Sequence, residues 1–235
     1  MLSPDAAGTA AAHRVPSGVP PQAMLSWLGM PGLTAFAGLT EIAKPLPGET
    51  VLVSAASGAV GQLVGQIAKL MGARCVAIAG SDEKLDYCRE IGFDAGINHR
   101  ATPDIAAAIS GACPDGIDVF WDNTGGPIHD AALAQLATHA RAVICGRIAT
   151  VDRPPSEDIG LRSSARLIVT RARVQGFVVF DWWHLRDKAM RLMKGWHEAG
   201  KLTFREDILD GFEQMPEAYL RMMSGRNMGK QLVRL

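Results

Sequence analysis

The sequence predicts an α/β protein built on a doubly wound parallel sheet of the Rossmann type. Three observations predict it: short apolar runs alternate with helical segments from residue 50 onward, a glycine-rich turn follows the first run, and aliphatic rather than aromatic residues dominate. Strands separated by helices need right-handed crossovers, which give a parallel sheet covered on both faces. Because 48% of the residues are hydrophobic and 20% are charged, the chain can bury such a core.

The predicted elements of this sheet follow one another in order. Residues 50–55 form a buried strand, and residues 59–71 have the apolar spacing of a helix, which Gly72 ends. The remaining predicted elements are a strand at 74–79, a helix from about 82 past 87, a strand at 95–98, a helix near 103–110, a strand at 117–121, a helix around 128–137 and a strand at 141–145.

A polar loop at residues 152–157 separates these elements from the rest of the chain. Strands are predicted at 173–180, 201–205 and 230–235, and helices at 184–199 and 212–223. The helix at 184–199 carries Met193 and Trp196 on one apolar face, which predicts core packing. The predicted organisation is a loose Ala/Pro/Gly-rich arm at 1–20, a nucleotide-binding domain at 21–200 and a C-terminal segment at 201–235.

Charge and cysteine content exclude several kinds of partner. The 24 basic and 24 acidic residues cancel, which argues against nucleic acid because phosphate neutralisation needs a basic surplus. Four scattered cysteines form no CxxC pair, and no Cys/His cluster has zinc spacing, so no metal site is predicted. Reduced thiols are expected.

The N-terminal region contains no predicted signal peptide or membrane span. No basic segment precedes an apolar one at the start, where Asp5 lies. Residues 15–40 carry no charge, but four prolines and several glycines interrupt any continuous apolar helix. We therefore expect a soluble, cytoplasmic protein with no membrane partner.

The turn between the first strand and its helix predicts dinucleotide binding. It reads Ala56-x-Gly58-x-x-Gly61, the fingerprint G-x-G-x-x-G with its first glycine replaced. Gly58 lets the backbone approach a pyrophosphate, Gly61 lets the helix pack closely on the sheet, and the helix N-terminus offers free N–H groups. The alternative is a tight turn with a purely structural role.

The end of the second strand favours NADP over NAD. An NAD enzyme usually has an acid there, whereas this strand ends in Gly80 and Ser81. Ser81 can donate to a 2′-phosphate and Lys84 can neutralise it. The alternative is that Ser81 only caps the next helix, but a cation at a helix N-terminus then needs an explanation. Asp82 stays a candidate for NAD.

Several further motifs together resemble one family. They are residues 28–36 (LGMPGLTAF), 53–61 (VSAASGAVG), 80–84 (GSDEK), 122–126 (DNTGG), 145–146 (CG), 176–180 (GFVVF) and 227–230 (NMGK). The chain resembles the zinc-independent medium-chain dehydrogenases/reductases, in the branch of prostaglandin reductases and NADPH-dependent 2-alkenal reductases. The likeness runs in order from about Pro21 to the C-terminus.

This resemblance implies a cofactor, a reaction and a set of binding residues. NADPH gives hydride to the β-carbon of an α,β-unsaturated aldehyde or ketone, and the enolate is then protonated without a metal. The residues implied to bind the cofactor are Gly58, Ala59, Val60, Gly61, Gly80, Ser81, Lys84, His99, Asn123, Cys145, Gly146, Ile148, Phe177, Val178, Val179 and Asn227. For Asn123 the alternative is a turn residue, and for 177–179 an ordinary strand.

The sequence departs from the family pattern at three places. Val151 stands where the family has a tyrosine that touches the nicotinamide ribose and the substrate, so no phenol can donate there, and no catalytic residue is assigned. His99 replaces the tyrosine of an Asn-Tyr pair. The family also carries a barrel-like domain ahead of the nucleotide-binding domain, to which residues 201–235 would belong; here we expect it to be mostly absent.

These departures leave other functions open. A non-catalytic NADPH-binding module is the main alternative to the reductase, and a zinc-dependent alcohol dehydrogenase is a weaker one. A homodimer is also expected, because the apolar strand at 173–180 would lie at a sheet edge and need a partner.

Overall fold

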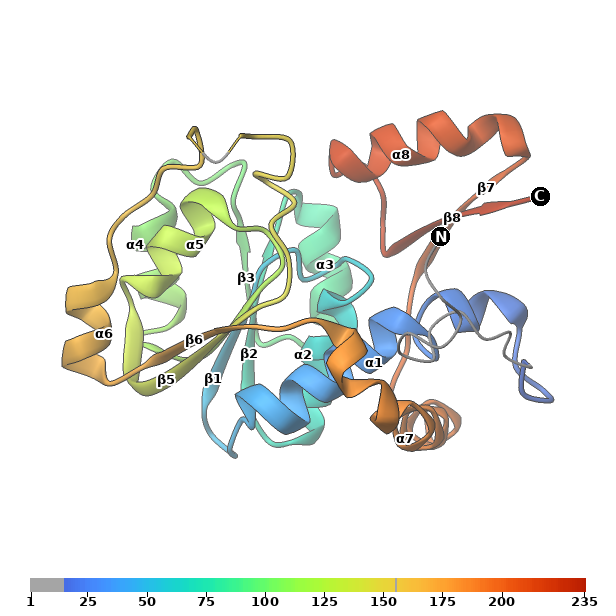
Figure 1. Cartoon of the computed structure of the whole chain (residues 1–235), viewed down its shortest axis with the longest axis horizontal. Coiled ribbons are helices and arrows are strands. Elements are labelled where there is room, and N and C mark those ends of the chain that lie inside the picture. The colour runs from blue at the N-terminus through green and yellow to red at the C-terminus, as the bar shows by residue number, and fades with distance from the viewer. Residues whose placement is uncertain (1–14, 155) are drawn as a thin grey trace.

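The centre of the molecule is a six-stranded parallel sheet with the order β3-β2-β1-β4-β5-β6 (Figure 1). It is seen in a computed structural model that describes residues 15–154 and 156–235. The direction of winding reverses between β1 and β4, which is the topology of the doubly wound Rossmann sheet. The predicted fold class is confirmed.

The strands of the sheet are short and largely buried. Those predicted at 74–79 and 95–98 have the predicted bounds. The six strands are β1 (Thr50–Val53), β2 (Arg74–Ala79), β3 (Ala95–Asn98), β4 (Ile117–Asp122), β5 (Leu136–Ile144) and β6 (Arg173–Gly176). Successive side chains point to opposite faces. Val51 and Val53 therefore enter one core cluster, while Leu52 enters the other.

Helices cover both faces of the sheet. On one face lie α1 (Met30–Ala37), α2 (Gly61–Leu70), α3 (Asp82–Glu90) and α7 (Arg186–Glu198). On the other lie α4 (Ile105–Ala112) and α5 (Gly126–Leu133), with α6 (Ser164–Thr170) beside them (Figure 1). Met193 of α7 is buried and Trp196 packs against the same core, which confirms the core role predicted for that face.

The uncharged N-terminal region folds into short pieces, as its prolines predict. A 3₁₀-helix at Pro21–Leu25 precedes α1, and the wider π-helical turn Gly38–Ala43 follows it. In the part of the chain that the structure describes, no helix has the length and apolar character needed to cross a membrane. Most of the predicted loose arm, residues 1–14, lies outside the described residues.

The C-terminal segment forms a separate small unit. β7 (Glu206–Asp210) and β8 (Lys230–Arg234) pair in parallel and are not part of the central sheet. Between them lie a 3₁₀ turn at Phe212–Gln214 and α8 (Met215–Met223), which lies on the α3 side of the molecule (Figure 1). The domain boundary at residue 201 stays a prediction.

The predicted strand at 173–180 is too long. The ladder with β5 ends at Gly176, and a 3₁₀-helix occupies Val179–Leu185. The chain turns there because this 3₁₀-helix packs on α1 and places Trp182 and Trp183 against the core. Residues 177–179 are therefore not an ordinary strand, and that alternative is wrong.

The predicted strand at 201–205 is also wrong, and the strand comes later, at β7. The backbone at 203–205 is bonded to side chains of α2 instead of to another strand. Gln66 exchanges two hydrogen bonds of 2.8 Å with the N–H and C=O of Thr203. Gln62 accepts from the N–H of Arg205 at 2.7 Å and donates to its carbonyl at 3.1 Å. Two amides one helical turn apart thus replace a neighbouring strand.

Smaller differences concern the ends of elements. The first strand stops at Val53 and α2 starts at Gly61, so the turn between them is longer than predicted. The helix predicted at 128–137 ends at Leu133, because β5 already begins at Leu136, which pairs with Ile117. The helix α6 was not predicted.

We predict that Gly61→Ala destabilises the fold. A Cβ at Gly61 would lie 2.4 Å from the carbonyl oxygen of Ala55 and 2.8 Å from the Cα of Ala56, both backbone atoms. Overpacking of this kind costs about 1–3 kcal/mol. Denaturant unfolding should show this loss, whereas Gly195→Ala, where a Cβ meets nothing within 4 Å, should gain about 0.5–1 kcal/mol. Equal effects at both glycines would contradict the packing role of Gly61.

Candidate functional site

The residues predicted to bind a cofactor follow the carboxyl ends of the six strands. Residues 58–61 follow β1, residues 80–84 follow β2, His99 follows β3, Asn123 follows β4, residues 145–148 follow β5, and Phe177 follows β6. Because every pair in the sheet is parallel, these ends lie along one edge. Ligands of open α/β sheets bind outside this edge, where the strand order reverses.

The turn after β1 is bonded to both neighbouring strands. The N–H of Ser54 donates to the carbonyl of Trp121 in β4, and that of Ala56 donates to the carbonyl of Ile78 in β2, both at 3.0 Å. Among the described residues, the N–H groups of Ala59 and Val60 donate no backbone hydrogen bond. These free donors at the start of α2 suit an anion.

The two glycines of the turn have different surroundings. At Gly61 a side chain would enter the backbone of the turn itself, so this glycine is required for packing. At Gly58 a Cβ would have a single neighbour within 4 Å, the carbonyl oxygen of Ala55 at 3.1 Å. The turn thus leaves the other side of Gly58 open for the approach of a ligand.

Ser81 caps α3, as the alternative interpretation held. Its Oγ accepts a hydrogen bond from the backbone N–H of Lys84 at 3.3 Å. The hydroxyl hydrogen is not used for this and stays able to donate to a ligand. The competing acid, Asp82, accepts from the Asn98 amide at 2.9 Å and does not line the cavity beside Ser81. This disfavours Asp82 as a ribose ligand.

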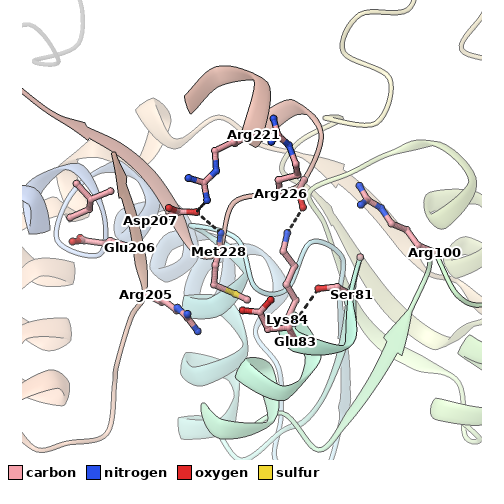
Figure 2. Close-up of a pocket in the computed structure, with 13 residues that line it drawn as sticks. Ser81, Glu83, Lys84, Arg100, Arg205, Glu206, Asp207, Arg221, Arg226 and Met228 are labelled. Carbon is pink, nitrogen blue, oxygen red and sulfur yellow. Dashed lines mark hydrogen bonds and ion pairs between the residues drawn. The ribbon is translucent and has the colours of Figure 1, made fainter. Parts of the chain in front are cut away.

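A cavity of about 530 Å³ opens between α3 and the C-terminal segment. Figure 2 shows Ser81, Lys84 and Arg100 on one side, and β7, α8 and the stretch that joins α8 to β8 on the other. Its lining residues are Gly80, Ser81, Glu83, Lys84, Arg100, Arg205, Glu206, Asp207, Ile208, Arg221, Gly225, Arg226 and Met228. The structure thus brings together three of the predicted residues: Gly80, Ser81 and Lys84.

Lys84 crosses this cavity to the C-terminal segment. Its Nζ donates to the carbonyl oxygen of Gly225 at 2.7 Å (Figure 2). Burial and the nearby guanidinium of Arg100 lower the pKa of Lys84. A bound anion would stabilise the charged form of Lys84 in these surroundings.

His99 lies beside the same cavity, next to Gly80. A Cβ at Gly80 would lie 3.3 Å from the His99 Nε2 and 3.2 Å from the Arg100 Nε, so a side chain there would have to displace the imidazole and the guanidinium slightly. Burial lowers the pKa of His99, and the charges of Arg100 and Lys84 lower it further. The imidazole is therefore mainly neutral near pH 7 and can donate or accept a hydrogen bond.

Asn123 follows a buried carboxylate and shares with it the partner Ser54. Asp122 is fully buried and accepts hydrogen bonds from the Ser54 hydroxyl at 2.9 Å and from the Nδ1 of His129 at 2.8 Å. These bonds lower the pKa of Asp122 against the effect of burial and raise that of His129. The amide of Asn123 donates to the carbonyl of Ser54 at 2.6 Å and accepts from the Trp121 indole at 3.1 Å. Asn123 thus has a structural role in the turn, and its contact with a cofactor stays a prediction.

The residues after β5 surround the Asn123 backbone. A Cβ at Gly146 would lie 2.9 Å from the carbonyl oxygen of Asn123, and the N–H of Ile148 donates to that oxygen at 3.4 Å. Burial raises the pKa of Cys145 to about 12, so its thiol is neutral and unreactive at neutral pH. Val151, in the position of the family tyrosine, lies in the next turn and is half exposed.

Residues 177–179 lie beside this group. The Phe177 ring meets the Trp121 indole edge-on, with centroids 6.0 Å apart. Val178 is exposed and Val179 is buried. Asn123, Cys145, Gly146, Ile148 and Phe177 therefore form a second group, around Trp121, that does not line the cavity at Lys84.

Asn227 belongs to the stretch that closes the cavity from the C-terminal side. Its amide donates to the carbonyl of Gly229 at 2.9 Å, and Gly229 forms an isolated parallel bridge with Gly58. The C-terminal segment thus reaches the turn after β1, and Asn227 lies between two residues that line the cavity.

Sequence reasoning missed the arginines of the cavity and the buried pair of Asp122 and His129. Arg205, Arg221 and Arg226 belong to segments whose position depends on the tertiary fold. Arg100 follows directly after a predicted site residue at a strand end, a signal that could have found it. In residues 15–154 and 156–235, no three His, Cys, Asp or Glu side chains form a cluster able to hold a metal ion.

Comparison with known proteins agrees with this geometry. A family model described as zinc-binding dehydrogenase matches residues 59–195. The chain is 47% identical, over 92% of its length, to the putative NADP-dependent oxidoreductase YfmJ of Bacillus subtilis, of which it covers 64%. It is 44% identical, over 88% of its length, to the 2-alkenal reductase (NADP(+)-dependent) of Nicotiana tabacum, of which it covers 60%.

A solved structure has the same fold. CurA of Vibrio vulnificus, in complex with NADPH, superposes with a TM-score of 0.85 at 37% identity, over 95% of this chain and 67% of CurA. The chain therefore belongs to the medium-chain dehydrogenases/reductases that the zinc-binding dehydrogenase model describes. Within them it belongs to the branch of NADP-dependent alkenal and prostaglandin reductases. It spans less than two thirds of the length of the first two curated relatives.

We predict that the pair of Asp122 and His129 stabilises the fold in a pH-dependent way. The pKa of His129 is raised in the folded state, so its contribution is full below the ordinary value of about 6.5 and is lost as pH rises through the raised pKa. His129→Ala should cost about 1.5–3 kcal/mol near pH 6 and clearly less near pH 9. Denaturant unfolding at both values measures this, with His184→Ala as the control. A cost independent of pH would contradict the ion pair.

Proposed function

We propose that this chain binds NADPH and reduces the carbon–carbon double bond of α,β-unsaturated aldehydes or ketones. One observation carries the proposal: a cavity with Ser81 and Lys84 lies after β2, where an NAD enzyme usually has an acid. The names of the relatives support it, since they include a 2-alkenal reductase and a (+)-pulegone reductase.

The residues present fit the cofactor along the sheet edge. The free N–H groups of Ala59 and Val60 and the open side of Gly58 would hold the pyrophosphate. Ser81 and Lys84 would hold the 2′-phosphate, with His99 beside them. The group around Trp121 would line the nicotinamide half, and Asn227 would close the site from the C-terminal side.

The chemistry divides between the cofactor and the chain. When bound, NADPH supplies the hydride. The residues of this chain would bind and orient it, and the fully buried Trp121, with the partly buried Cys145 and Phe177 packed beside it, would limit the access of water from one side. No side chain is assigned as the proton donor, because Val151 cannot donate a hydrogen bond.

A non-catalytic NADPH-binding module is the second candidate. One observation favours it: Val151 stands in the place where the resembling family has a phenol. The two candidates share the binding site and differ in turnover. A simple enal and a simple enone, each added with NADPH, separate them: loss of the reduced-nicotinamide absorbance supports the reductase, and its persistence with proven binding supports the module.

The binding half of the proposal is tested by Gly58→Val. The branched side chain would lie where the pyrophosphate approaches the backbone, so NADPH affinity should fall by at least about a hundredfold, which corresponds to about 2.7 kcal/mol. Calorimetric titration measures the affinity, and circular dichroism checks that the variant is folded, because a Cβ at Gly58 would lie 3.1 Å from the carbonyl oxygen of Ala55. Normal NADPH binding by the variant would make the turn purely structural.

We also propose a homodimer formed through β6. This strand lies at the sheet edge with exposed residues, and Val178 and Phe180 beyond it are exposed as well. Its unpaired N–H and C=O groups can be satisfied by the same strand of a second copy. The N–H of Phe177 points to β5, so alternation directs the N–H of Val174 outward.

Light scattering at micromolar concentration should therefore give twice the mass of one chain. Val174→Pro removes one outward donor from the ladder and should shift the protein toward monomer. A stable monomer at the outset would contradict edge pairing. A dimer that tolerates Val174→Pro would place the interface elsewhere.

A further inference from the structure

The charged residues of the cavity differ in how they are neutralised. Arg221 pairs with Asp207 at 2.8 Å, and Arg226 pairs with Glu217 at 3.2 Å. The guanidinium of Arg205 lies over the ring of Tyr87, 5.6 Å from its centroid. These three arginines therefore already have a carboxylate or a ring as partner: the pairs of Arg221 and Arg226 lie within the C-terminal segment, and Arg205 contacts α3.

Lys84 and Arg100 have no carboxylate partner of this kind: among the described residues, neither forms an ion pair. Each instead donates at 2.7 Å to a backbone carbonyl at the end of α8: Lys84 to Gly225 and Arg100 to Ser224. The last carbonyls of a helix carry partial negative charge, so they orient both cations without neutralising them. Two positive charges thus line the same cavity, each bound to the backbone at the end of α8 (Figure 2).

The α3 side of the cavity holds two further donors. Ser81 begins α3, so the positive end of this nine-residue helix faces the cavity. The hydroxyl hydrogen of Ser81 is not used in the cap and can donate to a ligand. The neutral ring of His99 and the guanidinium of Arg100 both lie next to Gly80. Hydrogen-bond donors and positive charges thus line the α3 side of the cavity together. The carboxylate on this side, that of Glu83, forms no ion pair with Lys84 or Arg100 among the described residues.

We propose that Arg100 is a specificity-determining residue that binds the 2′-phosphate of NADPH together with Lys84. The inference rests on the proposed function and deepens it. A phosphate monoester carries a charge of about −1.5 to −2 at neutral pH, which one lysine does not neutralise. A guanidinium can contact two phosphate oxygens at once, whereas lysine acts as a point charge. The carbonyl of Ser224 holds Arg100 ready for this contact.

Affinity ratios test the proposal, because NADPH and NADH differ only at the 2′-position. Arg100→Ala should weaken NADPH by about tenfold and change NADH by less than twofold. Adenosine 2′,5′-bisphosphate and adenosine 5′-monophosphate, which lack the nicotinamide, should repeat this difference. Arg100→Lys should restore part of the loss. The control is Arg89→Ala on the outer side of α3, where the guanidinium is exposed and pairs with Asp86 at 2.6 Å.

The outcomes separate this inference from the function on which it rests. An equal loss for NADPH and NADH in Arg100→Ala would mean that Arg100 only anchors the C-terminal segment through Ser224, and would overturn the inference. An unchanged NADPH affinity would overturn it as well, with the proposed function intact. Binding of neither cofactor by the unaltered chain would instead contradict the proposed function, and the inference with it.

Discussion

The buried carboxylate of Asp122 is the interaction on which the cofactor edge of the sheet depends. It lies at the end of β4, where the strand order reverses, and no part of it is exposed. A buried charge is costly unless it is paired and hydrogen-bonded. Here the Ser54 hydroxyl ties it to the end of β1, the N–H groups of Thr124 and Gly125 tie it to its own turn, and His129 ties it to α5. The ends of β1 and β4 and the start of α5 are therefore fixed relative to one another.

The second constraint is the attachment of the C-terminal segment to the sheet domain. Gln62 and Gln66 of α2 bind the backbone at residues 203 and 205, and Gly229 bridges to Gly58. Lys84 and Arg100 bind the end of α8. The segment thus contacts the turn after β1 and the turn after β2 at once. The cavity exists because these contacts hold a separate two-stranded unit over the sheet edge.

The sequence predicted most of the sheet and part of the site. The apolar run at residues 74–79 lies between helical segments and was correctly predicted as a strand with these bounds. Lys84 was found because a cation is unfavourable at a helix N-terminus. The structure of residues 177–180 was predicted wrongly, since the apolar pattern of this run fits a packed turn as well as a strand. The bond of Asp122 to Ser54 and the bonds of the extended backbone at 203–205 could not be predicted, because these partners are side chains distant in the sequence.

The central claim is that this edge binds a dinucleotide with its 2′-phosphate at Lys84. Calorimetric titration of the unaltered chain with NADPH and NADH, side by side in the same buffer, tests it most directly. Charge-assisted contacts are worth about 1.5–3 kcal/mol, so NADPH should bind roughly ten- to a hundredfold more tightly. Equal affinities for the two cofactors, or an affinity for NADPH that Lys84→Ala leaves unchanged, would contradict the claim.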